Sequence, residues 1–173
     1  VVRAIDNLKL EQSKICIVSG IGCSSRAPGY MNFNTLHTTH GRALAFATGI
    51  KMANPDLKVI VLTGDGDCSA IGGNHFIHAA RRNIDITTVV FNNSIYGMTG
   101  GQYSPLTPQN SRASTASRGT MERPFDMTEL ARVAGATYTA RATTYHVNLL
   151  SKLICDGANH KGFSFIEAVT ACP

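Results

Sequence analysis

The sequence has few charged residues and no hydrophobic run long enough to span a membrane. Lys, Arg, Asp and Glu make up 16% of its 173 residues, whereas about 25% is typical of globular proteins. We therefore expect the chain to bury much of its surface against partners or to belong to a larger assembly. No apolar stretch approaches the ~18 residues of a membrane helix, and the sequence indicates neither a secretory signal nor a membrane partner.

Other features of the composition narrow the class of protein further. Five cysteines at irregular spacing argue against the disulfide framework of a secreted protein, which favours a cytoplasmic location. The 16 basic residues outnumber the 11 acidic ones, but they are scattered, so no nucleic-acid partner is indicated. The 43% apolar content excludes a wholly disordered chain. The length suits one domain over residues 1–173, which we expect to be a fragment of a longer subunit truncated at both ends.

The sequence does contain a regular alternation of apolar runs and amphipathic stretches. The apolar runs predict strands over residues 15–18, 58–63, 86–91, 137–140 and 163–169. The amphipathic stretches predict helices over residues 1–8, 40–53, 70–82, 126–134 and 144–157, with Thr39 and Thr144 as helix caps. This order predicts an α/β fold with a mainly parallel sheet and helices on both faces.

Three segments rich in Gly, Ser, Asn and Pro each follow a predicted strand. They are residues 20–36, 64–67 and 92–124, and we expect them to be loops. In a parallel sheet, loops that follow strands meet at one edge, where ligands bind. We therefore expect all three segments to form one site, although simple mobility of residues 100–123 is an equal alternative.

Polar side chains suited to a metal follow two consecutive strands. Asp65 lies in Gly64-Asp65-Gly66-Asp67, and Asn93 follows 28 residues later, after one helix and one strand. Carboxylate and amide oxygens suit Mg²⁺, which also takes oxygens from phosphate and water. The glycines allow the backbone to approach a phosphate, and the next helix offers its N-terminus to negative charge. Together they predict a site for Mg²⁺ bound to a diphosphate, against the alternative that Gly-Asp-Gly is only a tight turn.

Longer motifs resemble one family, the β subunits of 2-oxoacid:ferredoxin oxidoreductases, and within it the 2-oxoglutarate type. The resemblance extends over residues 15–173. The residues that carry it are the thiamine diphosphate motif Gly64-Asp65-Gly66 with Asn92-Asn93, and the segments Ser19–Tyr30, His37–Arg42, Ile71–His75 and Ile95–Gln102. The fold implied is the diphosphate-binding half of a thiamine diphosphate enzyme.

The resemblance implies an enzymatic activity and a set of cofactors. The reaction is oxidative decarboxylation of a 2-oxoacid with coenzyme A to an acyl-CoA and CO₂, with electrons passed to ferredoxin. Thiamine diphosphate would act as the electron sink. Asp65 and Asn93, with the carbonyl of Ile95, would be the Mg²⁺ ligands. The residues implied around the cofactor are Gly64, Asp65, Gly66, Asp67, Ile71, Gly72, Asn93, Ile95, Tyr96, Gly97, Met98 and Thr99.

Two further side chains are candidate catalytic residues. By resemblance, His40 lies close to the cofactor, and the alternative is a histidine that only caps a helix. Arg26 stands beside the cysteine loop, where a guanidinium could hold a substrate carboxylate with two hydrogen bonds. An ordinary loop arginine is an equal alternative for Arg26.

The resemblance also implies a [4Fe–4S] cluster, of which this sequence holds only part. Cys23 and Cys172 match two of the family's four cysteine ligands, whereas the upstream Cys-x-x-Cys pair is not in the sequence. Spacing alone would leave both as buried thiols. Four thiolates are needed, so the cluster would be complete only in the whole subunit.

The glutamate that activates thiamine diphosphate is also not evident. None of the candidates, Glu11, Glu122, Glu129 and Glu167, lies in a comparable motif. We therefore expect an α subunit to supply a pyrimidine-binding domain at an interfacial active site, and the isolated chain to be inactive. Two alternatives stay open: a fragment of a non-oxidative thiamine diphosphate enzyme, and a non-catalytic module that binds Mg²⁺–diphosphate.

Overall fold

A computed structural model describes residues 1–172, and its centre is a six-stranded sheet in which every pairing is parallel. The strand order is β2-β1-β3-β4-β8-β7. The strands are β1 (Ile15–Ser19), β2 (Asn34–His37), β3 (Lys58–Gly64), β4 (Thr87–Asn92), β7 (Tyr138–Thr143) and β8 (Ser164–Val169). The inner strands are nearly continuous apolar runs because both of their faces are covered, as is usual in parallel sheets.

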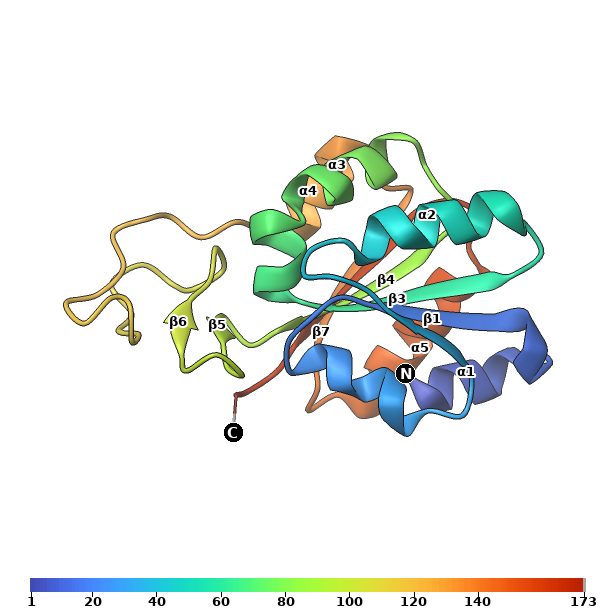
Figure 1. The fold of residues 1–173 in the computed structure, drawn as a ribbon, viewed down its shortest axis with the longest axis horizontal. Coiled ribbons are helices and arrows are strands. Elements are labelled where there is room, and N and C mark those ends of the chain that lie inside the picture. The colour runs from blue at the N-terminus through green and yellow to red at the C-terminus, as the bar shows by residue number, and fades with distance from the viewer. Residues whose placement is uncertain (173) are drawn as a thin grey trace.

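Helices cover both faces of the sheet, as the sequence predicts (Figure 1). On one face lie α2 (Ala43–Ala53), α3 (Gly73–Arg81) and α4 (Met127–Ala134), and on the other α1 (Val2–Leu8) and α5 (Val147–Asn159). The core of the first face contains Phe76, which lies 5.3 Å from Phe165 and 6.2 Å from Phe163 between ring centroids. The core of the second face packs Ile5 and Ile154 against the apolar strands.

The chain reverses its direction across the sheet between β1 and β3. After β1 it moves outward to the edge strand β2, and it then returns past β1 to form β3 and β4. Such a reversal separates the loops that follow β1 and β3, and it opens a crevice at the carboxyl ends of these strands. The three segments that follow β1, β3 and β4 meet at this crevice, which confirms the predicted convergence.

Both predicted helix caps are wrong. The helix predicted from residue 40 begins at Ala43, after Arg42, and Thr39 is not its cap. Residues 38–42 instead form a turn, with Gly41 at φ 70°. Likewise, α5 begins after His146 rather than at the predicted cap Thr144. In both places tertiary contacts hold the preceding turn in a non-helical conformation.

The structure also adds short elements within the predicted loops. Residues 20–36 contain the 3₁₀ helix Ser24–Tyr30 and the fully exposed edge strand β2, whose polar sequence has no apolar period. The helix predicted over 70–82 begins later, at Gly73, because the chain first forms a π-helical turn, Asp67–Ile71. Within residues 92–124, β5 (Ile95–Tyr96) pairs antiparallel with β6 (Gln102–Tyr103).

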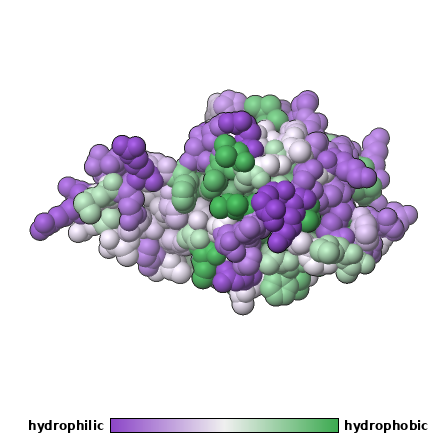
Figure 2. Space-filling model, turned by 90° about the horizontal axis from the view of Figure 1, so that it is seen from above, coloured by the Kyte–Doolittle hydropathy of each residue, from purple (hydrophilic) through white to green (hydrophobic). Residues whose placement is uncertain are grey.

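Residues 97–123 extend from the body of the protein as an arm (Figure 1). Seen from above, the arm is largely hydrophilic, whereas apolar and polar side chains are mixed over the body (Figure 2). The base of the arm is nevertheless buried, because Ser104, Leu106, Thr107 and Thr120 are each less than 7% exposed. The arm is therefore anchored to the sheet edge through its base. Among the helices of residues 1–172, none has both the length and the hydropathy required to cross a membrane.

Candidate functional site

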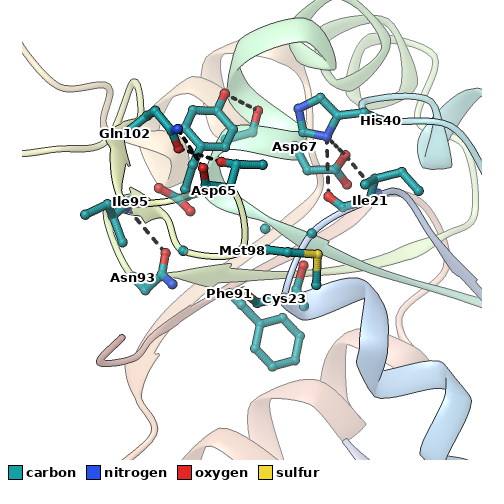
Figure 3. Close-up of a pocket in the computed structure, with 17 residues that line it drawn as sticks. Ile21, Cys23, His40, Asp65, Asp67, Phe91, Asn93, Ile95, Met98 and Gln102 are labelled. Carbon is teal, nitrogen blue, oxygen red and sulfur yellow. Dashed lines mark hydrogen bonds and ion pairs between the residues drawn. The ribbon is translucent and has the colours of Figure 1, made fainter. Parts of the chain in front are cut away.

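A pocket of about 390 Å³ lies at the carboxyl ends of β1, β3 and β4. This volume lies within the range of small-molecule sites in proteins. Figure 3 shows the side chains that project into it from the three loops. The lining residues are Ile21, Gly22, Cys23, Ser24, His40, Gly64, Asp65, Gly66, Asp67, Phe91, Asn93, Ile95, Tyr96, Gly97, Met98, Thr99 and Gln102.

Asp65 follows β3 directly and is only 3% exposed. Its Oδ2 atom accepts a hydrogen bond from the hydroxyl of Ser104, at the base of the arm. Burial raises the pKa of Asp65 above its ordinary value, and the Ser104 hydrogen bond opposes this rise. A carboxylate in this position would gain from a cation, because a cation offsets the cost of burying its charge.

Asn93 and Ile95 bring two more polar groups to Asp65. One terminal atom of the Asn93 amide lies 3.1 Å from Asp65 Oδ1 and 2.8 Å from the carbonyl oxygen of Ile95. If this atom is nitrogen, it donates to both oxygens. If it is Oδ1, it accepts from the Ile95 N–H at 3.3 Å, and three oxygens then face one another. Neighbouring ligands on an Mg²⁺ octahedron are about 2.9 Å apart, given bonds of about 2.0–2.1 Å. With Oδ1 in this position, its distances to Asp65 Oδ1 and to the Ile95 oxygen are both close to that spacing.

The carboxylate of Asp67 joins three loops. Its Oδ1 accepts from the backbone N–H of Gly41 at 2.6 Å and of Ile21 at 3.3 Å, and its Oδ2 accepts from the Thr63 hydroxyl at 2.6 Å. The side chain is 3% exposed. A Cβ atom on Gly20 would lie 2.1 Å from Asp67 Oδ2, so the backbone approaches the carboxylate as closely as glycine allows. Asp67 contacts the pocket, but protein donors occupy both of its oxygens.

His40 is held against Asp67 at the rim of the pocket (Figure 3). Its Nδ1 lies 2.8 Å from Asp67 Oδ1 and 3.3 Å from the carbonyl oxygen of Ile21. Both neighbours are acceptors, so Nδ1 carries a proton, and in the neutral ring Nε2 is then an acceptor. His40 does not cap α2, because Arg42 occupies the N-cap position.

The part of the pocket wall formed by Tyr96, whose ring centroid lies 6.1 Å from that of His40, depends on a glycine. The Tyr96 ring lies so close to Gly66 that an added Cβ would be 2.2 Å from its Cε1 atom. The Tyr96 hydroxyl also donates to the carbonyl of Gly66 at 3.2 Å. The middle glycine of Gly-Asp-Gly therefore allows the aromatic ring to pack against the turn.

Cys23 and Cys172 lie close together, although they stand near opposite ends of the sequence. Their sulfur atoms lie 3.2 Å and 3.3 Å from the position that a Cβ atom on Gly97 would occupy. Cys16 and Cys68 are buried in the core, and Cys155 is half-buried in α5. No group of three or more His, Cys, Asp or Glu side chains suited to a metal occurs within residues 1–172.

Apart from the cysteines, three of the predicted site residues do not line this pocket. Arg26 lies exposed in the 3₁₀ helix Ser24–Tyr30, Ile71 is 52% exposed at the end of the π-helical turn, and Gly72 packs against the backbone of Asp67 and Gly41. Arg26 lies in the loop after β1, as the sequence predicts, but its position in the 3₁₀ helix leaves it outside the pocket. The other predicted residues line the pocket, apart from Cys172, which lies behind Gly97.

The predicted site residues do not include Ser104, Thr63 and Gly41, which donate hydrogen bonds to Asp65 or Asp67. Ser104 lies 39 positions from Asp65 and belongs to a segment with no periodic pattern, so no sequence signal marks it. Gly41, in His37–Arg42, does lie in a motif that carries the family resemblance.

Comparison with known proteins places these residues in a family. The family model described as "Thiamine pyrophosphate enzyme, C-terminal TPP binding domain" matches residues 20–168. The "2-oxoglutarate synthase subunit KorB" of Archaeoglobus fulgidus is 59% identical over 99% of this chain and 64% of its own length. The protein of the same description from Methanothermobacter marburgensis is 61% identical over 99% of this chain and 60% of its own.

A solved structure is similar over the same extent. A chain of the "2-oxoglutarate:ferredoxin oxidoreductase from Magnetococcus marinus with 2-oxoglutarate, coenzyme A and succinyl-CoA bound" aligns with a TM-score of 0.97 and 42% identity. The alignment covers 99% of this chain and 59% of that one. The chain thus spans about three fifths of the length of these relatives. The matched domain, the parallel α/β fold and the loops at its carboxyl edge agree, and the chain belongs to the thiamine pyrophosphate enzymes, as their C-terminal cofactor-binding domain.

Proposed function

We propose that this chain is the cofactor-binding part of the β subunit of a 2-oxoacid:ferredoxin oxidoreductase. The observation that carries the proposal is the convergence of Asp65, Asn93 and the Ile95 carbonyl in the pocket. The relatives at 59% and 61% identity, both described as 2-oxoglutarate synthase subunits, favour 2-oxoglutarate as the 2-oxoacid. A cytoplasmic location and a single domain over residues 1–173 stay predictions.

Mg²⁺ would be held by these three oxygen groups. Their spacing fits an octahedral cation, and the remaining coordination positions would be taken by diphosphate and water. The diphosphate would lie against Gly64 and Gly66, which both line the pocket and carry no side chain of their own. Bound thiamine diphosphate supplies the electron sink for decarboxylation of a 2-oxoacid.

The residues of this chain would orient the cofactor and exclude water from it. Ile21, Phe91, Ile95 and Met98 give the pocket an apolar lining beside the metal site. His40, oriented by Asp67, would offer Nε2 as a hydrogen-bond acceptor to a bound ligand. Ile71 and Gly72 would support the pocket only through the turn that follows Asp67. Arg26 would reach a substrate carboxylate only after a movement of its loop.

Cys23 and Cys172 would be two of the four ligands of a [4Fe–4S] cluster behind Gly97. Two converging sulfurs fit half of a four-thiolate site, and the remaining pair would come from residues outside this chain. The cluster would pass electrons to ferredoxin. The expected iron–sulfur absorbance of the full-length protein should disappear when Cys23 is replaced by serine. Its absence in the unaltered protein would favour a non-oxidative thiamine diphosphate enzyme.

A partner subunit would complete the active site. No glutamate lines the pocket within the part of the chain that the structure describes. Ile21 and Met98 line the pocket yet are 49% and 54% exposed, so its mouth is open to a partner. An α subunit would cover this mouth and supply the pyrimidine-binding domain, and coenzyme A would enter the completed site. The arm, with Arg112, Arg118 and Arg123, is a candidate contact for either.

Calorimetric titration of thiamine diphosphate in the presence of Mg²⁺ tests the cofactor site. We expect Asp65→Ala to abolish binding and Asp56→Ala, an exposed carboxylate in the turn after α2, to leave it unchanged. Equal binding of nucleoside diphosphates would instead indicate a general Mg²⁺–diphosphate module. The isolated chain should not oxidise 2-oxoglutarate, and turnover by the chain alone would contradict the two-subunit proposal.

A further inference from the structure

Asn92, the first residue of the Asn-Asn pair, does not line the pocket, yet its whole side chain is engaged. Its Nδ2 donates to Glu167 Oε1 at 2.7 Å. Its Oδ1 accepts from both the N–H and the hydroxyl of Ser94, at 3.0 Å and 3.1 Å. The Asn92 carbonyl accepts from the N–H of Thr170 at 2.9 Å. Asn92 thus connects the turn that carries Asn93 and Ile95 to the neighbouring strand β8.

The turn needs this connection because its backbone conformation is unfavourable. Ser94 has φ 59°, a left-handed conformation that is costly for a residue with a Cβ atom. The two hydrogen bonds from Ser94 to Asn92 Oδ1 compensate for this cost. The Thr107 hydroxyl also donates to the Ser94 carbonyl at 2.5 Å. This conformation reverses the chain so that Asn93 and the Ile95 carbonyl both face Asp65.

Glu167 fixes the orientation of the Asn92 amide. The carboxylate is 3% exposed in the middle of β8. Its Oε2 accepts from Arg141 Nε at 2.7 Å and from the Thr128 hydroxyl at 2.9 Å, which leaves Oε1 for Asn92. Because carboxylate oxygens only accept, Glu167 requires the amide nitrogen of Asn92 on its side. The amide oxygen must then face Ser94.

We propose that Asn92 and Glu167 are positioning residues for the metal site of this protein. Glu167 orients Asn92, Asn92 holds Ser94 in its left-handed conformation, and Ser94 places the Asn93 amide and the Ile95 carbonyl beside Asp65. Neither residue touches the metal, so both act through the shape of the turn. The inference rests on the proposed function, because it assigns a role toward the Mg²⁺ of the cofactor site.

The alternative is that the network only stabilises the fold. Arg141 also binds Asp126 Oδ1 at 2.5 Å, and Asp126 caps α4, so Glu167 contributes to the packing of α4 and β7 as well. Thr128→Val separates the two roles. It removes one hydrogen bond to Glu167 Oε2 but leaves the bond from Asn92 to Glu167 in place.

The experiment measures Mg²⁺ affinity in the full-length protein assembled with its partner subunits. Metal is removed with a chelator, Mg²⁺ is titrated at saturating thiamine diphosphate, and binding is followed by near-ultraviolet circular dichroism, with the thermal midpoint recorded in parallel. We expect Asn92→Ala to weaken Mg²⁺ binding by about 10- to 100-fold, as loss of a group that orients metal ligands commonly does. Thr128→Val should lower the thermal midpoint and leave the Mg²⁺ dissociation constant unchanged.

A stricter test exchanges the amide of Asn92 and the carboxylate of Glu167. Asn92→Asp places two carboxylates against each other, and Glu167→Gln alone removes a carboxylate from the network, so each should weaken Mg²⁺ binding. When the two substitutions are combined, the amide introduced at position 167 can donate to the carboxylate introduced at position 92. That carboxylate can still accept from Ser94. The double variant should therefore recover most of the lost affinity.

The possible failures are distinguishable. If the unaltered protein binds no Mg²⁺–thiamine diphosphate, the proposed function is wrong, and the positioning role falls with it. If the unaltered protein binds and Asn92→Ala has the same Mg²⁺ affinity, the positioning role alone is overturned. Equal weakening of Mg²⁺ binding by Thr128→Val and by Asn92→Ala would also overturn the positioning role, because the network would then act only through the stability of the fold.

Discussion

Replacement of Asp67 by alanine should destabilise the protein strongly, although Asp67 has the appearance of a ligand-binding residue in the sequence. The Asp67 carboxylate is the shared acceptor for the Gly41 and Ile21 N–H groups and the Thr63 hydroxyl, and it pairs with His40. With alanine, these donors lose their acceptor in a site that is only 3% exposed. A hydrogen bond to a charged group contributes about 1.5–3 kcal/mol.

The magnitude follows from which donors are buried. Gly41 and Thr63 are buried, so their hydrogen bonds account for most of the loss, about 3–6 kcal/mol together. Such a loss is a large part of the roughly 5–15 kcal/mol by which a typical domain is stable. Asp67→Asn keeps an acceptor for Gly41, and its amide can donate to the Thr63 hydroxyl. These bonds then go to a neutral acceptor and contribute about 0.5–1.5 kcal/mol each, so we expect Asp67→Asn to cost about 2–3 kcal/mol.

Urea unfolding followed by far-ultraviolet circular dichroism measures both variants. The midpoint should fall in the order wild type, Asp67→Asn, Asp67→Ala, with an unchanged slope against urea concentration. Two results would contradict this prediction. One is an Asp67→Ala protein within about 1 kcal/mol of wild type, because the carboxylate would then not hold the three loops. The other is equal destabilisation by asparagine and alanine, because charge rather than hydrogen bonding would then dominate.

Three further predictions concern a glycine, a pH dependence and a buried thiol. Gly66→Ala places a methyl group 2.2 Å from Tyr96 Cε1. Because overpacking of this kind costs about 1–3 kcal/mol, calorimetry should show that thiamine diphosphate binds about 5- to 150-fold more weakly. The pKa of Asp126 is held below its ordinary 3.8, first by the Glu129 N–H and then by Arg141. The ionised Asp126 therefore stabilises the fold above pH 3.8, and this stabilisation is lost as the pH falls through the lowered pKa of the folded protein. The thermal midpoint of Asp126→Asn should accordingly vary less between about pH 4 and pH 2 than that of wild type. Burial raises the pKa of the Cys68 thiol, so iodoacetamide at about pH 8 should leave Cys68 unmodified until the protein unfolds. Detection of the label at Cys68 by mass spectrometry after treatment of the native protein would contradict this burial.

The fold class could be predicted from the sequence because its signal is local and repeated. Strands such as β3 are continuous apolar runs bounded by turn residues, and a strand buried on both faces needs little else to be identified. The alternation of strands and helices then requires crossover connections, which make the sheet parallel. The order of the strands and the identity of the edge strand were not accessible, because β2 is exposed and polar and resembles a loop.

The convergence of the two proposed metal ligands could also be predicted from the sequence. Asp65 and Asn93 are each attached directly to the end of a buried strand, so the sheet alone brings them together. The length of one helix and one strand between them fixes this arrangement without any information on side-chain packing. Cys23 and Cys172 differ in this respect, since only resemblance linked them, and the structure brings both sulfurs to Gly97.

The tertiary structure alone decided that Asp67 and Asn92, the polar neighbours of Asp65 and Asn93, hold the loops. Asp65 and Asp67 are two positions apart and look equivalent in the sequence. Folding brings Asn93 to Asp65 and surrounds Asp67 with donors from β3 and from the turns after β1 and β2. The same holds for Asn92 and Asn93, since one binds Glu167 and the other faces Asp65. The physical reason is that a hydrogen-bond partner 26 or 75 positions away leaves no trace in local composition. Whether a carboxylate binds a cation or the backbone therefore depends on the donors that folding brings to it.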